Sequence, residues 1–246
     1  MIRGGLFLLW MAVTVIPYAI FVIVISLFLR GNRLYWITVG WLRVTMFGAR
    51  LIGSVRHELR GVENLPPPES LQPLILCPKH QSTWETFALP TVASHPLAFV
   101  FKKELLLIPF FGWAMGRLDM IKIDRSKRAE AFNKVAAQGR ELMGKGVWVI
   151  MFPEGTRVAR GDKGVYKSGA SRLAVATGAS IVPVAVSSAR CWPRKSFRLI
   201  PGTVVVSFGP QLASEGRDPS ELMKEVETWV EAEMRQIDSE AYETRN

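Results

Sequence analysis

Two short motifs in the sequence carry side chains that can do chemistry. The first begins at His80 and places a carboxylate five positions later, at Glu85. The second follows an apolar run and reads Glu154, Gly155, Thr156, Arg157. A histidine with a carboxylate partner can act as a general base, and a guanidinium beside a glycine can hold a phosphate with two parallel hydrogen bonds. Together the motifs indicate a base and an anion-binding site.

His80 and Glu85 can meet only in one kind of local structure. On a regular helix five residues turn by about 140°, so the two side chains would not share a face. They meet if His80 lies on the turn that leaves the apolar run 74–77 and Glu85 lies in the first turn of the next helix, with Ser82 or Thr83 near its cap. Glu85 would then accept a hydrogen bond from Nδ1 and leave Nε2 to take a proton. Taken alone, the pair also fits a histidine that is merely hydrogen-bonded at a strand end.

The second motif follows the apolar run 147–152, and the ends of strands are where α/β folds bind ligands. Arg125, after a run that ends at Ile123, offers a second guanidinium in the same kind of position. Each arginine also has a plainer interpretation. The segment 154–157 can be a tight turn with an exposed arginine, and Asp124 can start a helix with Arg125 on its surface.

The elements that must position these motifs alternate between strands and helices. Short apolar runs predict strands at residues 74–77, 97–101, 120–123, 147–152, 181–186 and 204–208, and His57 alternates with apolar neighbours in another. The clearest helices have Ser126 and Asp218 as caps and end near residues 143 and 237. This order predicts an α/β catalytic domain over residues 57–246.

The composition indicates a membrane surface. The 246-residue chain is 49% hydrophobic and still carries a formal net charge of +10. Between residues 102 and 172, 15 Lys and Arg stand against 7 Asp and Glu, which would attract anionic ligands and lipid headgroups. Solvated helix faces would produce the same excess. The two cysteines, Cys77 and Cys191, form no metal-ligand spacing and indicate a reduced compartment.

Residues 1–56 predict a helical membrane anchor. Residues 6–29 carry no charge and, at about 1.5 Å per residue, would cross a hydrocarbon core of roughly 30 Å. A cleaved signal peptide is the competing interpretation, although the run is long for one. Residues 34–53 contain Arg43 and Arg50 and suit an interfacial or re-entrant helix, which would complete a hairpin. The arginines that follow the first helix favour the cytoplasmic face of a membrane, the inner membrane in a bacterium, for the rest of the chain.

Four blocks of the chain resemble, in this order, the 1-acyl-sn-glycerol-3-phosphate acyltransferase family. They span residues 80–85, 102–125, 152–157 and 181–185. The resemblance implies an α/β fold with a mixed sheet flanked by helices. It also implies transfer of a fatty acyl group from an acyl thioester, on coenzyme A or acyl carrier protein, to the sn-2 hydroxyl of lysophosphatidic acid, which gives phosphatidic acid.

The resemblance assigns a role to each site residue. His80 would be the general base, Glu85 would orient it, and the hydroxyl oxygen would attack the thioester directly, without an acyl-enzyme. The glycerol-phosphate portion would be bound by Lys102, Arg125, Glu154, Gly155, Thr156 and Arg157. The family usually has Asp at the position of Glu85, so the carboxylate here reaches one methylene further. The apolar run 105–111 would be a wall of the acyl-chain tunnel, a second membrane-contacting patch or a core helix.

Two other functions fit parts of the pattern. The same pair would serve an acyltransferase with a different lysolipid, or water, as acceptor. A membrane-tethered basic module without enzymatic activity would bind nucleic acid or acidic lipid, but aromatic residues are not interleaved with the basic ones, so we expect no nucleic-acid partner.

Metals and nucleotide cofactors are not expected beyond the carrier of the acyl group. Neither His57 nor His95 has neighbours at metal-ligand spacing, and the sequence has no glycine-rich phosphate loop. The expected partners are lysophosphatidic acid, the acyl donor and the lipid bilayer.

Overall fold

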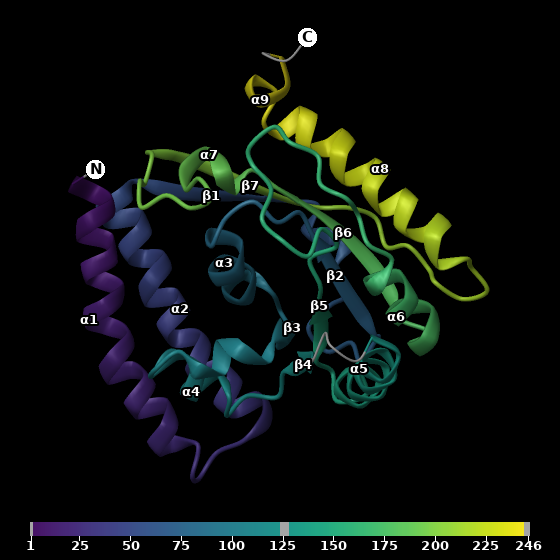
Figure 1. Ribbon diagram of the computed structural model, residues 1–246, viewed down its shortest axis with the longest axis horizontal. Coiled ribbons are helices and arrows are strands. Elements are labelled where there is room, and N and C mark those ends of the chain that lie inside the picture. Colours follow the sequence, from purple (N-terminus) through teal and green to yellow (C-terminus); the bar gives the residue numbers. More distant parts are fainter. Residues whose placement is uncertain (1, 124–127, 244–246) are drawn as a thin grey trace.

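The chain forms a helical hairpin followed by an α/β domain, over the residues that the computed structural model describes, 2–123 and 128–243 (Figure 1). Its strands are β1 (Val55–Arg60), β2 (Leu74–Pro78), β3 (Leu97–Lys102), β4 (Ile121–Ile123), β5 (Trp148–Ile150), β6 (Ser180–Val186) and β7 (Gly202–Phe208). The longer helices are α1 (Ile2–Ile25), α2 (Gly31–Gly53), α3 (Trp84–Val92), α5 (Arg128–Met143), α6 (Gly169–Thr177) and α8 (Pro219–Ile237). Short helical turns are η1 (Val62–Asn64), η2 (Lys103–Leu107), α4 (Phe111–Met115), α7 (Ser188–Cys191) and α9 (Glu240–Glu243).

The strands of the described chain form one mixed sheet in the order β1-β7-β6-β2-β5-β3-β4. Neighbouring strands run parallel except β6 and β7, which are antiparallel. Each apolar run that predicted a strand forms one, and so does the segment around His57. The α/β fold with a mixed sheet flanked by helices is therefore confirmed. The helix expected to begin at Ser126 is α5, although Ser126 itself lies outside the described residues.

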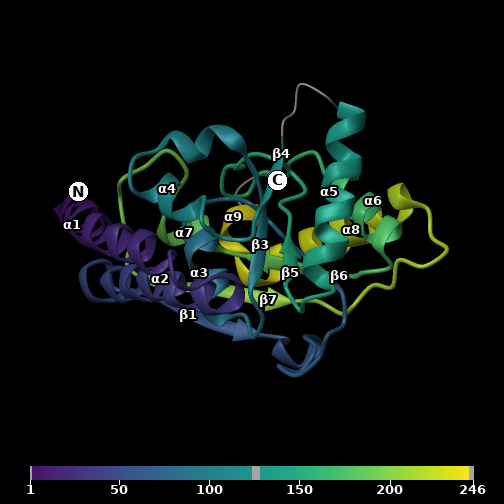
Figure 2. The same ribbon diagram turned by 90° about the horizontal axis from the view of Figure 1, so that it is seen from below.

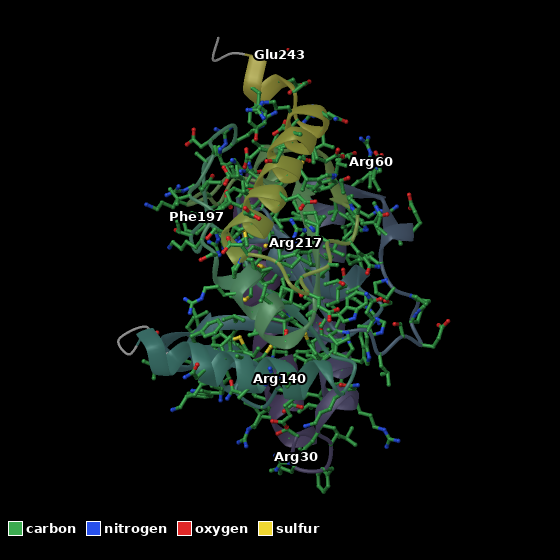
Figure 3. All side chains as sticks on the ribbon, turned by 90° about the vertical axis from the view of Figure 1, so that its right-hand side faces the viewer. Arg30, Arg60, Arg140, Phe197, Arg217 and Glu243 are labelled. Carbon is green, nitrogen blue, oxygen red and sulfur yellow. The ribbon has the colours of Figure 1, made fainter. Side chains whose placement is uncertain are left out.

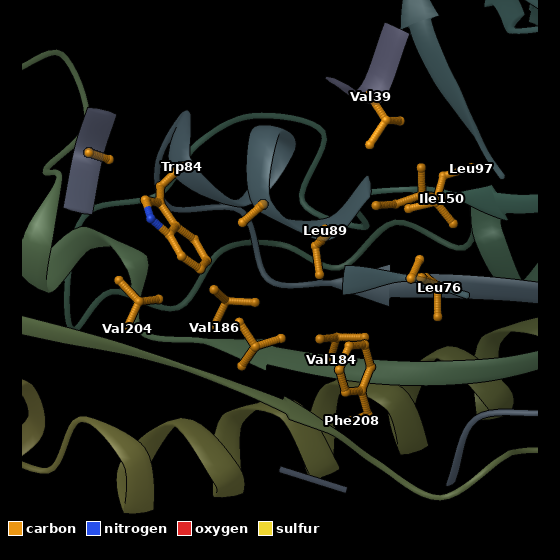
Figure 4. Close-up of a cluster of buried hydrophobic side chains, with 14 of the residues drawn as sticks. Val39, Leu76, Trp84, Leu89, Leu97, Ile150, Val184, Val186, Val204 and Phe208 are labelled. Carbon is orange, nitrogen blue, oxygen red and sulfur yellow. The ribbon is translucent and has the colours of Figure 1, made fainter. Parts of the chain in front are cut away.

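The central strands β2 and β5 are apolar and buried at every position, as expected where a sheet is covered on both faces. Along β2, Leu74 and Leu76 belong to the core cluster that α2 and α3 cover. Ile75 and Cys77 point into the opposite cluster, which α5, α6 and α8 cover. Figure 4 shows the first cluster, with Trp84 of α3 beside the apolar side chains of the sheet. His80 and the second motif thus leave the sheet from between two packed layers.

The helical hairpin lies at one end of the molecule, and α5 and α6 lie at the other (Figures 1 and 2). Helix α1 packs along α2, where Trp10 donates a hydrogen bond to the carbonyl of Val44 (3.1 Å) and Tyr18 to that of Ile37 (2.7 Å). Arg30 lies at the loop between the two helices, at the opposite end of the molecule from Glu243 (Figure 3).

Helix α1 is the helix of the described chain that is long and apolar enough to cross a membrane, with a mean hydropathy of 2.6. It spans Ile2–Ile25 rather than 6–29, because the chain turns after Ile25 so that α2 can pack back against α1. The outer side of α1 exposes a row of large apolar side chains: Leu6, Leu9, Val13, Ile16, Ile20, Phe21 and Val24. Among the described residues, α2 does not meet the same criterion, so the first half of the expected hairpin is a candidate membrane span and the expectation of an interfacial or re-entrant second helix stays a prediction.

The N-terminus of α8 provides a test of the capping that the sequence predicts. Asp218 accepts hydrogen bonds from the backbone N–H groups of Ser220 (2.8 Å) and Glu221 (3.1 Å), with Pro219 at the first helical position. We expect Asp218→Ala to lower the free energy of unfolding by about 1 kcal/mol and the melting temperature by roughly 2–4 °C. Thermal unfolding in detergent measures this. Asp218→Ser, which keeps an acceptor, should stay close to the wild type, and an equal loss in both variants would contradict the role of the cap.

Candidate active site

The two motifs meet because β2 and β5 are parallel neighbours. Ile75 is paired with Val149 and Leu76 with Ile150, so the segments that follow the two strands leave the sheet at the same edge. β3 and β4 continue the parallel arrangement beyond β5, and their pairing places the backbone of Lys102 opposite Ile123 at this edge. This is the edge at which α/β folds bind their ligands.

Glu85 holds the imidazole of His80 by its Nδ1 atom. The distance from Nδ1 to Oε1 of Glu85 is 2.9 Å. The same carboxylate oxygen accepts the backbone N–H groups of Gln81 and Ser82, both at 2.7 Å. Glu85 lies in the first turn of α3, and the hydroxyl of Ser82 accepts the N–H of Trp84 (3.1 Å). The turn-to-helix geometry that the sequence requires is therefore confirmed, and the helix N-terminus stabilises the buried carboxylate.

The imidazole of His80 is fixed on one side and open on the other. Its ring stacks on Phe152, with the ring centroids 3.9 Å apart and the planes 23° from parallel. The side chain is 13% exposed and lines a large cavity. Since Nδ1 is occupied by Glu85, Nε2 is the nitrogen that remains for a ligand in that cavity.

The cavity has a volume of about 1100 Å³ and two kinds of lining. Cationic side chains line it together with His80: Arg157, Lys167 and Arg172. Most of the remaining lining is apolar and comes from the hairpin, α3 and the segment around α4, for example Val15, Val22, Leu42, Phe87, Leu105 and Phe111. The run 105–111 thus forms part of the wall, and it also exposes Leu107 on the surface. A ligand with an anionic head and a long apolar tail matches this combination.

Gly155 and Arg157 lie where the sequence predicts them, in the cavity with His80. Gly155 has a positive φ of 65°, and a Cβ atom there would lie 3.1 Å from Nζ of Lys167, so a side chain would be both strained and crowded. The side chain of Arg157 forms no hydrogen bond or ion pair within the part of the chain that the structure describes. Its guanidinium is available to a ligand.

Glu154 and Thr156, which the sequence predicts to bind the substrate, do not line the cavity with Arg157. The carboxylate of Glu154 is buried and does not line the cavity; it accepts the backbone N–H of His80 (2.7 Å) and an Nζ–H of Lys79 (3.1 Å). Burial raises the pKa of Glu154, and Lys79 and the N–H of His80 oppose that rise. Thr156 is exposed and also lies outside the cavity lining. The turn thus places the side chain of Glu154 in the interior and that of Thr156 on the surface, while Arg157 lines the cavity.

Two other predicted binding residues fall outside the described structure. The backbone of Lys102 ends β3 at the site edge, but its side chain is not among the described ones. Arg125 lies wholly outside the described residues. Both remain predictions.

Sequence reasoning missed several residues that the fold brings to the site. Lys167 and Arg172 line the cavity, but their spacing in the sequence matches no pattern that predicts a binding site. The sequence signal was clearer for Lys79. A lysine that directly follows a fully buried strand is itself buried, and a buried ammonium group needs carboxylate partners. Its partners are Glu154 and Glu231, of which the second lies 152 residues away in the sequence. Among the described residues no three His, Cys, Asp or Glu side chains are arranged to hold a metal ion.

Comparison with known proteins agrees with this site. Residues 56–187 match the family model described as Acyltransferase. A 1-acyl-sn-glycerol-3-phosphate acyltransferase from Pseudomonas aeruginosa is 40% identical over 208 residues, which cover 83% of this chain and 79% of the relative. The chain belongs to the 1-acyl-sn-glycerol-3-phosphate acyltransferase family.

More distant members of the acyltransferase family share the same core. The mouse 1-acyl-sn-glycerol-3-phosphate acyltransferase alpha is 30% identical over 183 residues, 74% of this chain and 63% of the mouse protein. The crystal structure of the 1-acyl-sn-glycerophosphate acyltransferase PlsC from Thermotoga maritima superposes with a TM-score of 0.77 at 26% identity and covers 96% of each chain. The likeness to PlsC therefore extends over the hairpin as well as the sheet.

The length of Glu85 is a testable feature of this acyltransferase. Its Oε1 atom serves three N–H donors at 2.7–2.9 Å, and a side chain shorter by one methylene cannot reach all of them without moving the imidazole. We expect Glu85→Asp to lower kcat/KM for acyl transfer roughly 10- to 100-fold. The matched change Glu58→Asp, at a half-exposed residue paired with Arg60, should leave activity unchanged. Activity of Glu85→Asp within twofold of the wild type would contradict the geometry.

Proposed function

We propose that this acyltransferase moves a fatty acyl group from an acyl thioester, on coenzyme A or acyl carrier protein, to the sn-2 hydroxyl of lysophosphatidic acid and so produces phosphatidic acid. The observation that carries the proposal is that the imidazole of His80 and the guanidinium of Arg157 line one cavity whose other walls are largely apolar. The names of the relatives in Pseudomonas aeruginosa and mouse agree with this substrate. No resident cofactor is needed, because the donor arrives already activated as a thioester.

In the proposed mechanism His80 is the general base. Nε2 takes the proton of the sn-2 hydroxyl while the hydroxyl oxygen attacks the carbonyl carbon of the thioester. The imidazolium that forms then gives this proton to the departing thiolate. One C–O bond forms, one C–S bond breaks, and no covalent enzyme intermediate is required. Glu85, 2.9 Å from Nδ1, keeps the imidazole in the tautomer that can accept at Nε2 and stabilises the imidazolium.

The phosphate of the acceptor would be held by the cationic lining of the cavity. Arg157 offers a planar fork that matches two phosphate oxygens, and Lys167 and Arg172 add positive charge in the same cavity. We retain Lys102 and Arg125 as further phosphate contacts, since Lys102 ends β3 and Arg125 comes two residues after the end of β4 in the sequence. The acyl tail would lie against the apolar walls.

We also propose that residues 1–56 anchor the enzyme to a membrane and that residues 57–246 act at its cytoplasmic face, the inner membrane in a bacterium. Helix α1 turns large apolar side chains outward, and its Val15, Ala19 and Val22 line the cavity. A lysophospholipid can thus pass from the bilayer to the site along one helix, without its tail crossing water.

His80→Ala tests the proposed base. With purified enzyme, lysophosphatidic acid and an acyl-CoA, we expect the variant to lose kcat about 10²- to 10⁴-fold, the usual contribution of a positioned general base. Phosphatidic acid is measured by mass spectrometry of the lipids. The control is His57→Ala, at a histidine outside the cavity lining. Wild-type activity of His80→Ala would refute the mechanism.

Arg157→Ala tests the phosphate site. The loss of charge-assisted hydrogen bonds should lower kcat/KM for lysophosphatidic acid roughly 10- to 100-fold. A monoacylglycerol acceptor lacks the phosphate, so its slower turnover should hardly change. Arg217→Ala, which removes a partly exposed arginine paired with Glu225, is the matched control. Full activity of Arg157→Ala toward lysophosphatidic acid would favour a different acceptor.

Charge placed on α1 tests the anchor. Leu9 and Val13 are 60% and 62% exposed, and an Asp within a membrane helix costs up to about 3 kcal/mol. We expect Leu9→Asp/Val13→Asp to abolish flotation with phospholipid vesicles. The matched pair Val62→Asp/Leu71→Asp changes exposed apolar residues outside the hairpin and should float like the wild type. Equal flotation of both double variants would refute the anchor.

A further inference from the structure

A buried ionic cluster lies directly behind the site. Nζ of Lys79 is 3.1 Å from Oε1 of Glu154 and 2.6 Å from Oε1 of Glu231, and the hydroxyl of Tyr166 donates to the same oxygen of Glu231 (2.8 Å). The side chains of Lys79 and Glu154 are 0% exposed and that of Glu231 is 6% exposed. These four residues are called the Lys79 cluster below.

The Lys79 cluster joins parts of the chain that no sequence motif connects. Lys79 follows β2, Glu154 follows β5, and Tyr166 belongs to the loop before α6. Glu231 comes from α8, outside the residues 56–187 that match the family model. Helix α8 covers the face of the sheet opposite to α3, the helix that carries Glu85 (Figure 1).

The burial of two carboxylates with one ammonium is a poor way to stabilise a fold. The desolvation of such groups often outweighs their attraction, and apolar side chains of similar size are commonly as stable. Burial, and after it the two nearby carboxylates, raise the pKa of Tyr166, so its hydroxyl remains a donor to Glu231. Stabilisation of the fold is therefore a poor explanation for these buried charges, which indicates that they have a different role.

The Lys79 cluster is hydrogen-bonded, through Glu154, to the backbone of His80, the proposed base. One carboxylate oxygen of Glu154 contacts Lys79, and the other accepts the N–H of His80 at 2.7 Å. The carbonyl of His80 accepts the N–H of Val158 at 2.8 Å. The segment after β5 thus holds both the N–H and the carbonyl of His80. Glu154 in that segment is in turn linked through Lys79 to Glu231 of α8.

We infer that Glu231 is a positioning residue of the acyltransferase: through Lys79 it fixes Glu154, and Glu154 fixes the backbone from which His80 directs its imidazole into the cavity. The inference rests on the proposed role of His80 as the base. It makes the C-terminal helix α8 a functional part of the active site, and it gives Glu154 a supporting role behind the substrate.

Glu231→Ala tests the inference in the full-length enzyme, with lysophosphatidic acid and acyl-CoA as substrates. Since Glu231 does not line the cavity, we expect kcat to fall about 10- to 100-fold, the effect of roughly 1 Å of misplacement, while KM for both substrates stays within twofold. Glu231→Gln keeps an acceptor oxygen for Lys79 and Tyr166 and should recover most of the lost kcat. Tyr166→Phe removes the hydroxyl that donates to Glu231 and leaves the ion pair with Lys79 in place. This variant is used for the test if Glu231→Ala does not fold.

Two controls on the same helix separate positioning from stability. Glu225→Ala removes a half-exposed carboxylate paired with Arg217 and should leave both kcat and melting temperature unchanged. Val226→Ala removes buried apolar volume without polar contacts, so it should lower the melting temperature and leave kcat unchanged at a temperature where it is folded.

The outcomes distinguish this inference from the proposed function. Wild-type kcat in Glu231→Ala, or in Tyr166→Phe where it is used instead, overturns the inference and leaves the role of His80 intact. A loss of kcat in Val226→Ala equal to that in Glu231→Ala also overturns it, because stability alone would then explain both. A wild-type enzyme that makes no phosphatidic acid overturns the proposed function, and the inference with it.

Discussion

A single carboxylate oxygen organises the site. Oε1 of Glu85 receives Nδ1 of His80 and two backbone N–H groups, and all three donors lie within 2.9 Å. This requires His80 to leave β2 in a tight turn and α3 to begin at Trp84, so that the carboxylate lies in the first helical turn. The imidazole then has one nitrogen held and one directed to the cavity. The proposed acid–base chemistry depends on that division.

The pairing of β2 with β5 supplies the rest of the site. Parallel neighbours place the glutamate-glycine-threonine-arginine turn beside His80, although the two motifs lie far apart in the sequence. Phe152, two residues after the end of β5, stacks on the imidazole, and Arg157 reaches the same cavity from the end of the turn. The hairpin completes the walls with apolar side chains, so the apolar hairpin and the polar site share one cavity.

The sequence predicted what local rules determine. Continuous apolar runs located the strands, the proline after Asp218 located α8, and the five-residue spacing of His80 and Glu85 required the turn that the structure contains. It could not predict that the carboxylate of Glu154 is buried outside the cavity, because a tight turn has no periodicity that assigns its side chains to a face. The burial of Glu231 could not be predicted for a related reason. On an amphipathic helix, a buried glutamate has the same spacing as the apolar residues around it, and only the fold shows its partner.

The structure of the enzyme with lysophosphatidic acid and a non-transferable acyl-CoA analogue bound tests the central claim most directly. The account predicts the sn-2 hydroxyl oxygen within about 3.2 Å of Nε2 of His80 and the phosphate against the guanidinium of Arg157. A hydroxyl directed at a different base, or a phosphate bound outside the cavity, would contradict it.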